Sequence, residues 1–308
     1  MVDLAQSISS LVSPALAGFL IVATRLASVI LIDFATFLFA VLTLLVIRFP
    51  RPEASAEGAA ARGSLIREAA CGWAYITQRP GLSGLLILYA ALNFLGITTE
   101  VLLRPYVLSF ASADVLGLIV SASGAGLLVG GLIMSIWGGP KRRIYSILGS
   151  ELLVGLCTML IGMWSSALLT GIAVLLYFIC VEISDAGSLA LWQSKVAPDF
   201  QGRVFAMRRM IYLSALPLGL LITAPLAEYV LEPSLNYNGA LAGSVGQVIG
   251  VGPGRGIGLL FILTGIFNML VVVVGALHPR IRLVEDELPD AITGQAGPRS
   301  TMICSPPC

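Results

Sequence analysis

Charged residues are scarce in this sequence, and their scarcity excludes most classes of soluble protein. Only 11% of the 308 residues are charged, whereas 57% are hydrophobic and the mean hydropathy is +0.94. A soluble domain has about 25% charged residues, so this chain cannot cover a water-facing surface. The 18 lysine and arginine residues are spread over short segments rather than gathered on one face, which argues against nucleic acid as a partner.

Histidine and cysteine are too few and too scattered for metal or redox chemistry. His278 is the one histidine, and none of the five cysteines stands at a metal-ligand spacing from it. Cys157 and Cys180 lie in apolar runs, where we expect packing residues. An aspartate-rich magnesium motif and a His-Glu metal motif are both missing, which argues against a membrane enzyme. We therefore predict no metal, no cofactor and no catalytic residue.

Long apolar runs dominate the sequence instead. The hydrocarbon core of a bilayer is about 30 Å thick and needs about 20 helical residues. Eight runs approach or exceed this length, at 6–23, 28–47, 83–103, 115–137, 144–163, 167–190, 210–230 and 257–277. The predicted fold class is all-α, a polytopic membrane helix bundle with about eight transmembrane helices. Pro217 and Pro225 inside one run fit this class, because a membrane helix tolerates prolines that would break a soluble one.

The basic residues predict the orientation of these spans. If the chain starts in the cytoplasm, only Arg25, Arg104 and Arg255 of the 18 basic residues fall on the far side. Cytoplasmic loops carry the excess of lysine and arginine, so the opposite orientation would violate this rule at each basic loop. We therefore expect both termini to be cytoplasmic.

Two local patterns predict how parts of the chain pack. In the inner loop, Leu65, Ala69 and Trp73 share one helical face, which predicts an amphipathic helix on the membrane surface; a solvated connector is the alternative. In the fourth span, Gly126 and Gly130 are four residues apart, with Ala122 one turn before them. Small residues at this spacing predict a close approach between two helices.

Ionisable and polar residues inside the predicted spans are candidates for a proton or substrate pathway, because lipid penalises them. Glu182 and Asp185 are three residues apart on one helix face and could carry a proton together. Glu100 and Arg104 are four apart and could pair, and Glu151 lies alone within the fifth span. The candidate set is Asp33, Asn93, Glu100, Arg104, Glu182 and Asp185. For each of them, a structural contact between helices or a position near water is the alternative.

An internal similarity links the second span to the last. Each span follows an arginine, and each is followed by a Pro-Arg pair, Pro50-Arg51 and Pro279-Arg280. The preceding spans also match loosely, so a two-helix unit recurs six spans later. This period is typical of transporters built from two parallel six-helix halves.

Several segments resemble exporters of the major facilitator superfamily. They are Q-G-R-V-F-A-M-R-R-M-I at 201–211, R-I-R-L-V-E-D-E-L-P-D at 280–290 and L-I-D-F-A-T-F at 31–37. The subgroup they resemble is the drug and siderophore exporters, which include macrolide efflux proteins and the enterobactin exporter. Residues 138–143, G-G-P-K-R-R, resemble the superfamily's basic loop between helices eight and nine. On this resemblance, the cytoplasmic basic gating loops contain Lys141, Arg142, Arg143, Arg203, Arg208 and Arg209.

The resemblance also implies a division of the chain. The superfamily has twelve spans, and this chain starts where the fifth is expected. Residues 1–48 then form the last two helices of the N-terminal half, and 49–81 a cytoplasmic linker with the amphipathic helix. Residues 82–280 form the six-helix C-terminal half, and 281–308 a cytoplasmic tail.

The function implied by the resemblance is secondary active transport in the cell (inner) membrane. We expect proton-coupled efflux of a small amphipathic compound, drug-like or siderophore-like, by an N-terminally truncated chain. The expected partners are the lipid bilayer, the small-molecule substrate and a second chain that supplies the missing helices. A transport-inactive fragment, or one part of a split transporter, is the alternative.

Overall fold

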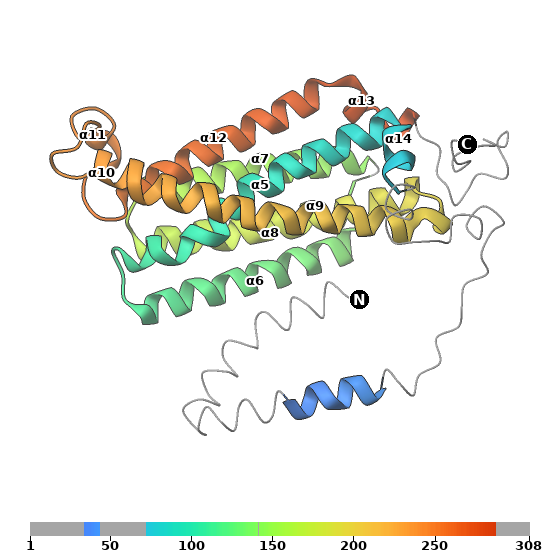
Figure 1. Ribbon diagram of the computed structural model, residues 1–308, viewed down its shortest axis with the longest axis horizontal. Coiled ribbons are helices and arrows are strands. Elements are labelled where there is room, and N and C mark those ends of the chain that lie inside the picture. The colour runs from blue at the N-terminus through green and yellow to red at the C-terminus, as the bar shows by residue number, and fades with distance from the viewer. Residues whose placement is uncertain (1–33, 44–71, 141, 288–308) are drawn as a thin grey trace.

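The computed structural model describes residues 34–43, 72–140 and 142–287 (Figure 1). Within these ranges the regular secondary structure is helical, with no strand. Six of the described helices are long and apolar enough to cross a membrane. The predicted all-α membrane bundle is thus confirmed. The shorter helix Phe34–Thr43 falls inside the second predicted span, and the first predicted span lies outside the described residues.

The six long elements alternate in direction along the chain (Figure 1). They are α5 (Pro80–Leu108), α6 (Ala113–Trp137), α7 (Arg143–Met163), α8 (Ala167–Lys195), α9 (Pro198–Pro225) and α12 (Arg255–Leu277). The short elements are η1 (Leu226–Leu231), α10 (Glu232–Ser234), α11 (Gly246–Ile249), α13 (Pro279–Arg282) and α14 (Val284–Glu287). We call the end of the bundle where α5 and α7 begin and α8 ends the basic end, and the end that holds α10 and α11 the loop end.

Proline and glycine mark several helix boundaries. Pro80 and Pro198 occupy the first turns of α5 and α9, where the missing N–H of proline costs no hydrogen bond. Gly138 ends α6 in the left-handed conformation, with φ of 70°. After Pro225 the backbone continues as the π-helix η1, so the prolines alter the helix without ending it.

α9 corrects one prediction from the sequence. It begins at Pro198 rather than at 210, so Arg203, Arg208 and Arg209 lie on a helix and not in a gating loop. The sequence of this segment did not suggest a buried helical face, yet Val204 and Met207 are buried against the bundle while Arg209 is exposed. Arg143 likewise starts α7, Arg142 is its N-cap residue, and Lys141 lies outside the described residues.

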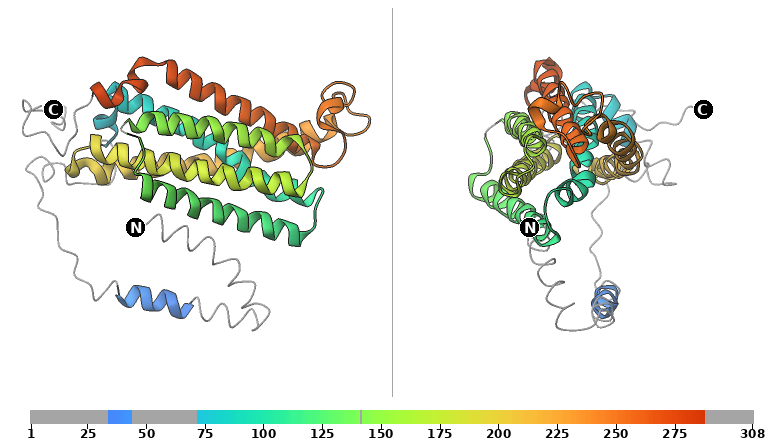
Figure 2. Two further views of the ribbon diagram at one scale, coloured as in Figure 1. Left: turned by 180° about the vertical axis from the view of Figure 1, so that it is seen from behind. Right: turned by 90° about the vertical axis from the view of Figure 1, so that its left-hand side faces the viewer.

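The long helices pack in the order α6, α8, α7, α12, α5, α9, each in close contact with the next (Figure 2). Glycine allows the closest contacts. A Cβ atom at Gly130 would lie 2.8 Å from the carbonyl oxygen of Ile179 in α8, and one at Gly126 would lie 2.6 Å from that of Leu175. The predicted close approach at these two glycines is confirmed, and its partner is α8.

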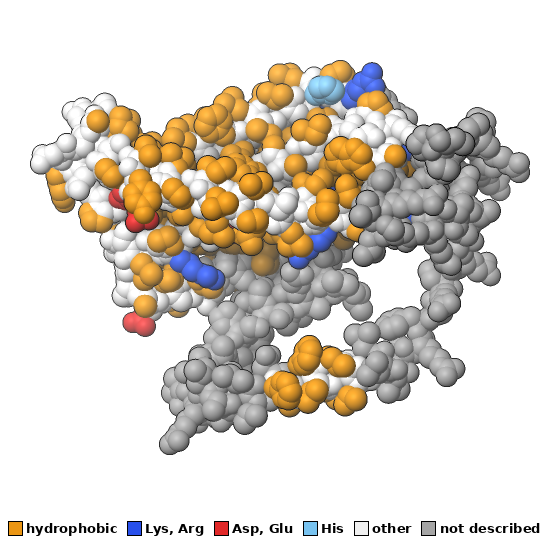
Figure 3. Space-filling view, viewed as in Figure 1, with side chains coloured by type: hydrophobic (Ala, Val, Ile, Leu, Met, Phe, Trp, Pro, Cys, Tyr) orange, Lys and Arg blue, Asp and Glu red, His pale blue; other side chains and the backbone are white. Residues whose placement is uncertain are grey.

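Apolar side chains are spread over the face of the bundle seen in Figure 3. Leu118, Ile136, Leu168 and Leu221 are each more than 70% exposed, as expected for residues in contact with lipid. At the basic end, Ile76 and Val284 are fully buried in the same apolar cluster, so 72–77 and α14 both pack on the bundle. Trp73 is half exposed, and Leu65 and Ala69 of the predicted amphipathic helix lie outside the described residues. The division at 81 and 280 stays a prediction.

Candidate functional site

Two acidic side chains, Glu100 and Asp185, are exposed within helices that are long enough to cross the membrane. Glu100 lies on α5 and Asp185 on α8. Tyr212 of α9 lies within electrostatic range of both carboxylates and of Arg209. Three helices therefore direct polar and charged side chains to one region. We call this region the polar face and define it by Glu100, Asp185, Arg209 and Tyr212.

The polar face is unsuited to contact with lipid. Transfer of a charged side chain to the bilayer centre costs about 2.5–3.5 kcal/mol on insertion scales, so such residues face a bundle interior or a water-filled cavity. Glu100 and Asp185 both lie well away from the ends of their helices. The exposed acids therefore mark the side of the bundle that is expected to meet water, substrate or further helices.

The other candidates from the sequence have more local surroundings. Asn93 donates a 2.8 Å hydrogen bond from Nδ2 to the carbonyl oxygen of Tyr89, one turn earlier on α5. Arg104 is exposed one turn beyond Glu100, but within the described residues the two do not form the predicted ion pair. Glu182 packs against α6, where a Cβ atom at Gly130 would lie 2.7 Å from its own Cβ. Asp33 lies outside the described residues.

A buried polar network lies behind the polar face and centres on Glu151 of α7, which is only 7% exposed. The Ser184 hydroxyl of α8 donates a 2.7 Å hydrogen bond to Glu151 Oε1. The Tyr89 hydroxyl of α5 donates to the Ser184 carbonyl oxygen at 3.1 Å and lies 3.3 Å from Ser184 Oγ. Asn268 of α12, which is 3% exposed, also lies against Glu151. Four helices thus meet around one carboxyl group.

Arg208 of α9 continues this polar region toward the basic end. Its Nη2 donates a 2.9 Å hydrogen bond to the buried Ser188 hydroxyl of α8. Its guanidinium carbon lies 4.8 Å from the Trp192 ring centroid and 5.7 Å from the Phe205 and Tyr89 centroids. Aromatic faces attract a guanidinium group through their negative quadrupole. This arginine therefore joins α9 to α8 and α5 from inside the bundle.

The basic end is held by contacts with α14. Glu285 accepts hydrogen bonds from the backbone N–H groups of Arg143 and Ile144, at 3.1 and 3.2 Å, and so caps the start of α7. Lys195 at the end of α8 donates to the Glu285 carbonyl oxygen at 2.8 Å. Arg142 pairs with Asp286 at 3.4 Å, and both side chains are half exposed. Part of the predicted gating set therefore has a structural partner in the predicted tail.

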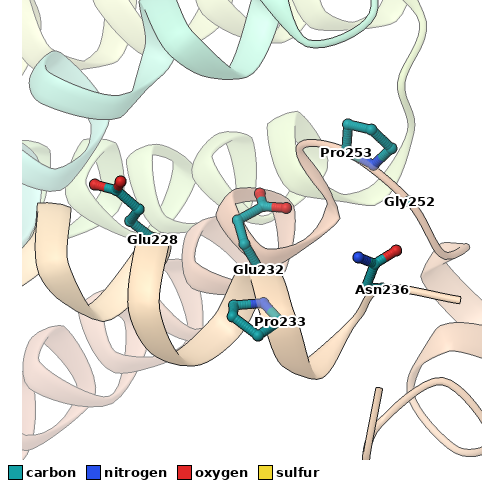
Figure 4. Close-up of a pocket in the computed structure, with 6 residues that line it drawn as sticks. All are labelled: Glu228, Glu232, Pro233, Asn236, Gly252 and Pro253. Atoms are coloured by element: carbon teal, nitrogen blue, oxygen red, sulfur yellow. The ribbon is translucent and has the colours of Figure 1, made fainter. Parts of the chain in front are cut away.

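A separate cavity of about 370 Å³ lies at the loop end, lined by Glu228, Glu232, Asn236 and neighbouring residues (Figure 4). The Glu232 carboxylate accepts hydrogen bonds from the backbone N–H groups of Gly254 and Ile257, at 3.2 and 3.1 Å. It therefore caps the start of α12, and we assign it a structural role. Within the described ranges, no group of three or more histidine, cysteine, aspartate or glutamate side chains is placed to hold a metal ion.

The bundle and its polar face define a class, namely an α-helical membrane protein with exposed acidic residues on one side of a six-helix unit. The family model described as the Major Facilitator Superfamily matches residues 1–220, and the chain belongs to this superfamily. It is a multi-pass membrane protein, as the sequence predicted.

Among the curated relatives that the chain matches are macrolide efflux proteins. It is 27% identical over 234 residues to macrolide efflux protein A of Streptococcus pyogenes, covering 73% of this chain and 56% of that protein. It is 28% identical over 224 residues to the protein of the same name from Enterococcus faecalis, covering 70% of this chain and 67% of that protein. The chain thus spans little more than half the length of the S. pyogenes relative. No solved structure matches it significantly.

Proposed function

We propose that the described helices form one half of an efflux transporter for a small amphipathic, drug-like or siderophore-like compound, driven by proton entry. The observation that carries this proposal is the polar face, where α5, α8 and α9 bring Glu100, Asp185, Arg209 and Tyr212 together. In transporters of two repeats, the substrate binds between the halves near the middle of the membrane. The similarity to macrolide efflux proteins supports the substrate class and the direction of transport.

We further propose that transport needs helices that cover the polar face. Exposed acids in lipid would be costly, and a second half on this side would enclose them with the substrate. A second chain is one source of such helices, and a bundle with no transport activity of its own is the alternative. The basic end faces the cytoplasm of a cell (inner) membrane under this proposal, because Arg142, Arg143 and Lys195 gather there.

The test is transport of a radiolabelled macrolide, erythromycin, into inverted vesicles with an imposed pH gradient. The vesicles contain the 308-residue chain together with the part of S. pyogenes macrolide efflux protein A that the chain does not match. Asp185→Asn and Glu100→Gln are each expected to reduce gradient-driven uptake at least tenfold. Asp114→Asn is the matched control, because Asp114 is an exposed acid in the first turn of α6, away from the polar face. Equal uptake by all four proteins would contradict the proposed role of the face.

A further inference from the structure

The residues around Glu151 can hydrogen-bond to its carboxyl group both as the anion and as the neutral acid. Its hydrogen-bonding neighbours are the Ser184 hydroxyl and the Asn268 amide, with the Tyr89 hydroxyl next in line. A hydroxyl donates or accepts, and a side-chain amide does either by turning over. An arginine or lysine partner would fix the carboxylate as an anion, and a wholly apolar pocket would fix it as the neutral acid. Neither condition holds at Glu151.

The wider surroundings contain no cation in direct contact with this carboxyl group among the described residues. Tyr89 faces it from α5, and Tyr177, Cys180 and Asp185 face it from α8. From α12 the facing polar group is Asn268, whose Oδ1 accepts no hydrogen bond from the described residues. Among the described residues, no cationic partner therefore fixes Glu151 as the anion.

A change of protonation at Glu151 would reach other helices through Ser184. With a charged carboxylate, Ser184 donates to Glu151, as the 2.7 Å contact shows. With a neutral acid, the Glu151 O–H donates to Ser184 Oγ, and the Ser184 proton must turn elsewhere, with Tyr89 Oη at 3.3 Å the nearest partner on another helix. Tyr89 in turn lies beside Arg208 of α9. Protonation on α7 therefore reverses the hydrogen bond between α7 and α8 and turns the Ser184 proton toward α5.

The network adjoins the polar face through Asp185. Asp185 follows Ser184 directly in α8 and is exposed, whereas Ser184 is fully buried. A proton that reaches Asp185 from water is then within electrostatic range of Glu151. We infer that Glu151, rather than the pair Glu182 and Asp185 alone, is the buried residue of this bundle that takes up and releases the coupling proton. The coupling role of Glu151 rests on the proposed function, but the protonation of Glu151 can be measured without transport.

Infrared spectroscopy on the purified 308-residue chain in lipid nanodiscs tests the inference. We expect a protonated-carboxyl band that grows as the pH falls and that is missing from Glu151→Gln, a variant of nearly equal size. Ser184→Ala removes the 2.7 Å hydrogen bond and is expected to shift the frequency of this band. If Glu151→Gln does not fold, the Ser184→Ala shift alone decides. Identical titrations of the wild type and Glu151→Gln, or an unmoved band in Ser184→Ala, would overturn the inference.

The infrared titration and the transport assay test this inference and the proposed function separately. A titrating Glu151 in a chain that transports nothing, even with completing helices, would contradict efflux but support the inference. Macrolide transport without any titration of Glu151 would do the reverse. When both hold, Glu151→Gln is expected to lose accumulation driven by a pH gradient, at least tenfold, while it keeps exchange of labelled for unlabelled macrolide across the membrane.

Discussion

Glu285 in α14 lies against the start of α7, where its Oε1 atom accepts a 3.1 Å hydrogen bond from the backbone N–H of Arg143. Its second carboxylate oxygen, Oε2, accepts a hydrogen bond from the next backbone N–H group, that of Ile144. A carboxylate at a helix N-terminus satisfies otherwise unpaired donors and interacts favourably with the helix dipole. Residues far apart in the sequence thus fix the basic end of the bundle.

Removal of this cap is expected to destabilise the bundle. We predict that Glu285→Ala lowers the free energy of unfolding by about 1–2 kcal/mol, the range of a lost N-cap. Asp286→Ala is the matched control, because its ion pair with Arg142 is half exposed and such pairs contribute about 0–1 kcal/mol. Denaturant unfolding of both variants in detergent micelles measures the difference. Equal stability of the two variants would contradict the capping role.

The contact between α7 and α12 depends on paired glycines. A Cβ atom at Gly162 would collide with the backbone carbonyl oxygen of Gly258, and neither backbone can move aside without separating the helices. We predict that Gly162→Ala lowers the unfolding free energy by about 1–3 kcal/mol, the usual cost of overpacking. Gly149→Ala on the same helix is the control, because nothing lies within 4 Å of a Cβ atom there. Thermal unfolding in micelles measures the stability of the two variants. A Gly162→Ala variant as stable as Gly149→Ala would contradict the close contact between α7 and α12.

The sequence predicted helices well and contacts between helices poorly. Apolar length gave the six described spans, because a bilayer imposes a minimum run on any crossing helix. The prediction from apolar runs was wrong at the start of α9. The sequence suggested that Arg208 lies in a loop, but its side chain is packed among Trp192, Phe205 and Tyr89. Local composition cannot show that a charged side chain will find partners on other helices.

The same limit applies to the buried network. The sequence places Glu151 inside a span, but its partners Ser184, Tyr89 and Asn268 lie on three other helices. Spacing along one helix suggested the pairs Glu100–Arg104 and Glu182–Asp185 instead. Such pairs are the ones that a helical period reveals, whereas a contact across helices depends on which faces pack together.

The orientation of the bundle is open to direct measurement. In a variant without its five cysteines, we predict that Arg142→Cys reacts with a membrane-impermeant maleimide only from the cytoplasmic side. Ala240→Cys, in the loop end between α10 and α11, is expected to react only from the opposite side. The reason is the excess of basic residues at the basic end. Reversed labelling at both positions would show that the orientation is inverted.

The final prediction concerns the cover of the polar face. Because Glu100 and Asp185 are exposed on one side of the six-helix unit, we expect the purified 308-residue chain alone to accumulate no erythromycin in proteoliposomes with an imposed pH gradient. Addition of the unmatched part of S. pyogenes macrolide efflux protein A, fused or as a second polypeptide, is expected to establish accumulation. An added segment with scrambled loops but unchanged apolar spans serves as the control for nonspecific insertion. Strong gradient-driven accumulation by the chain alone would show that the polar face needs no helices beyond those of this chain.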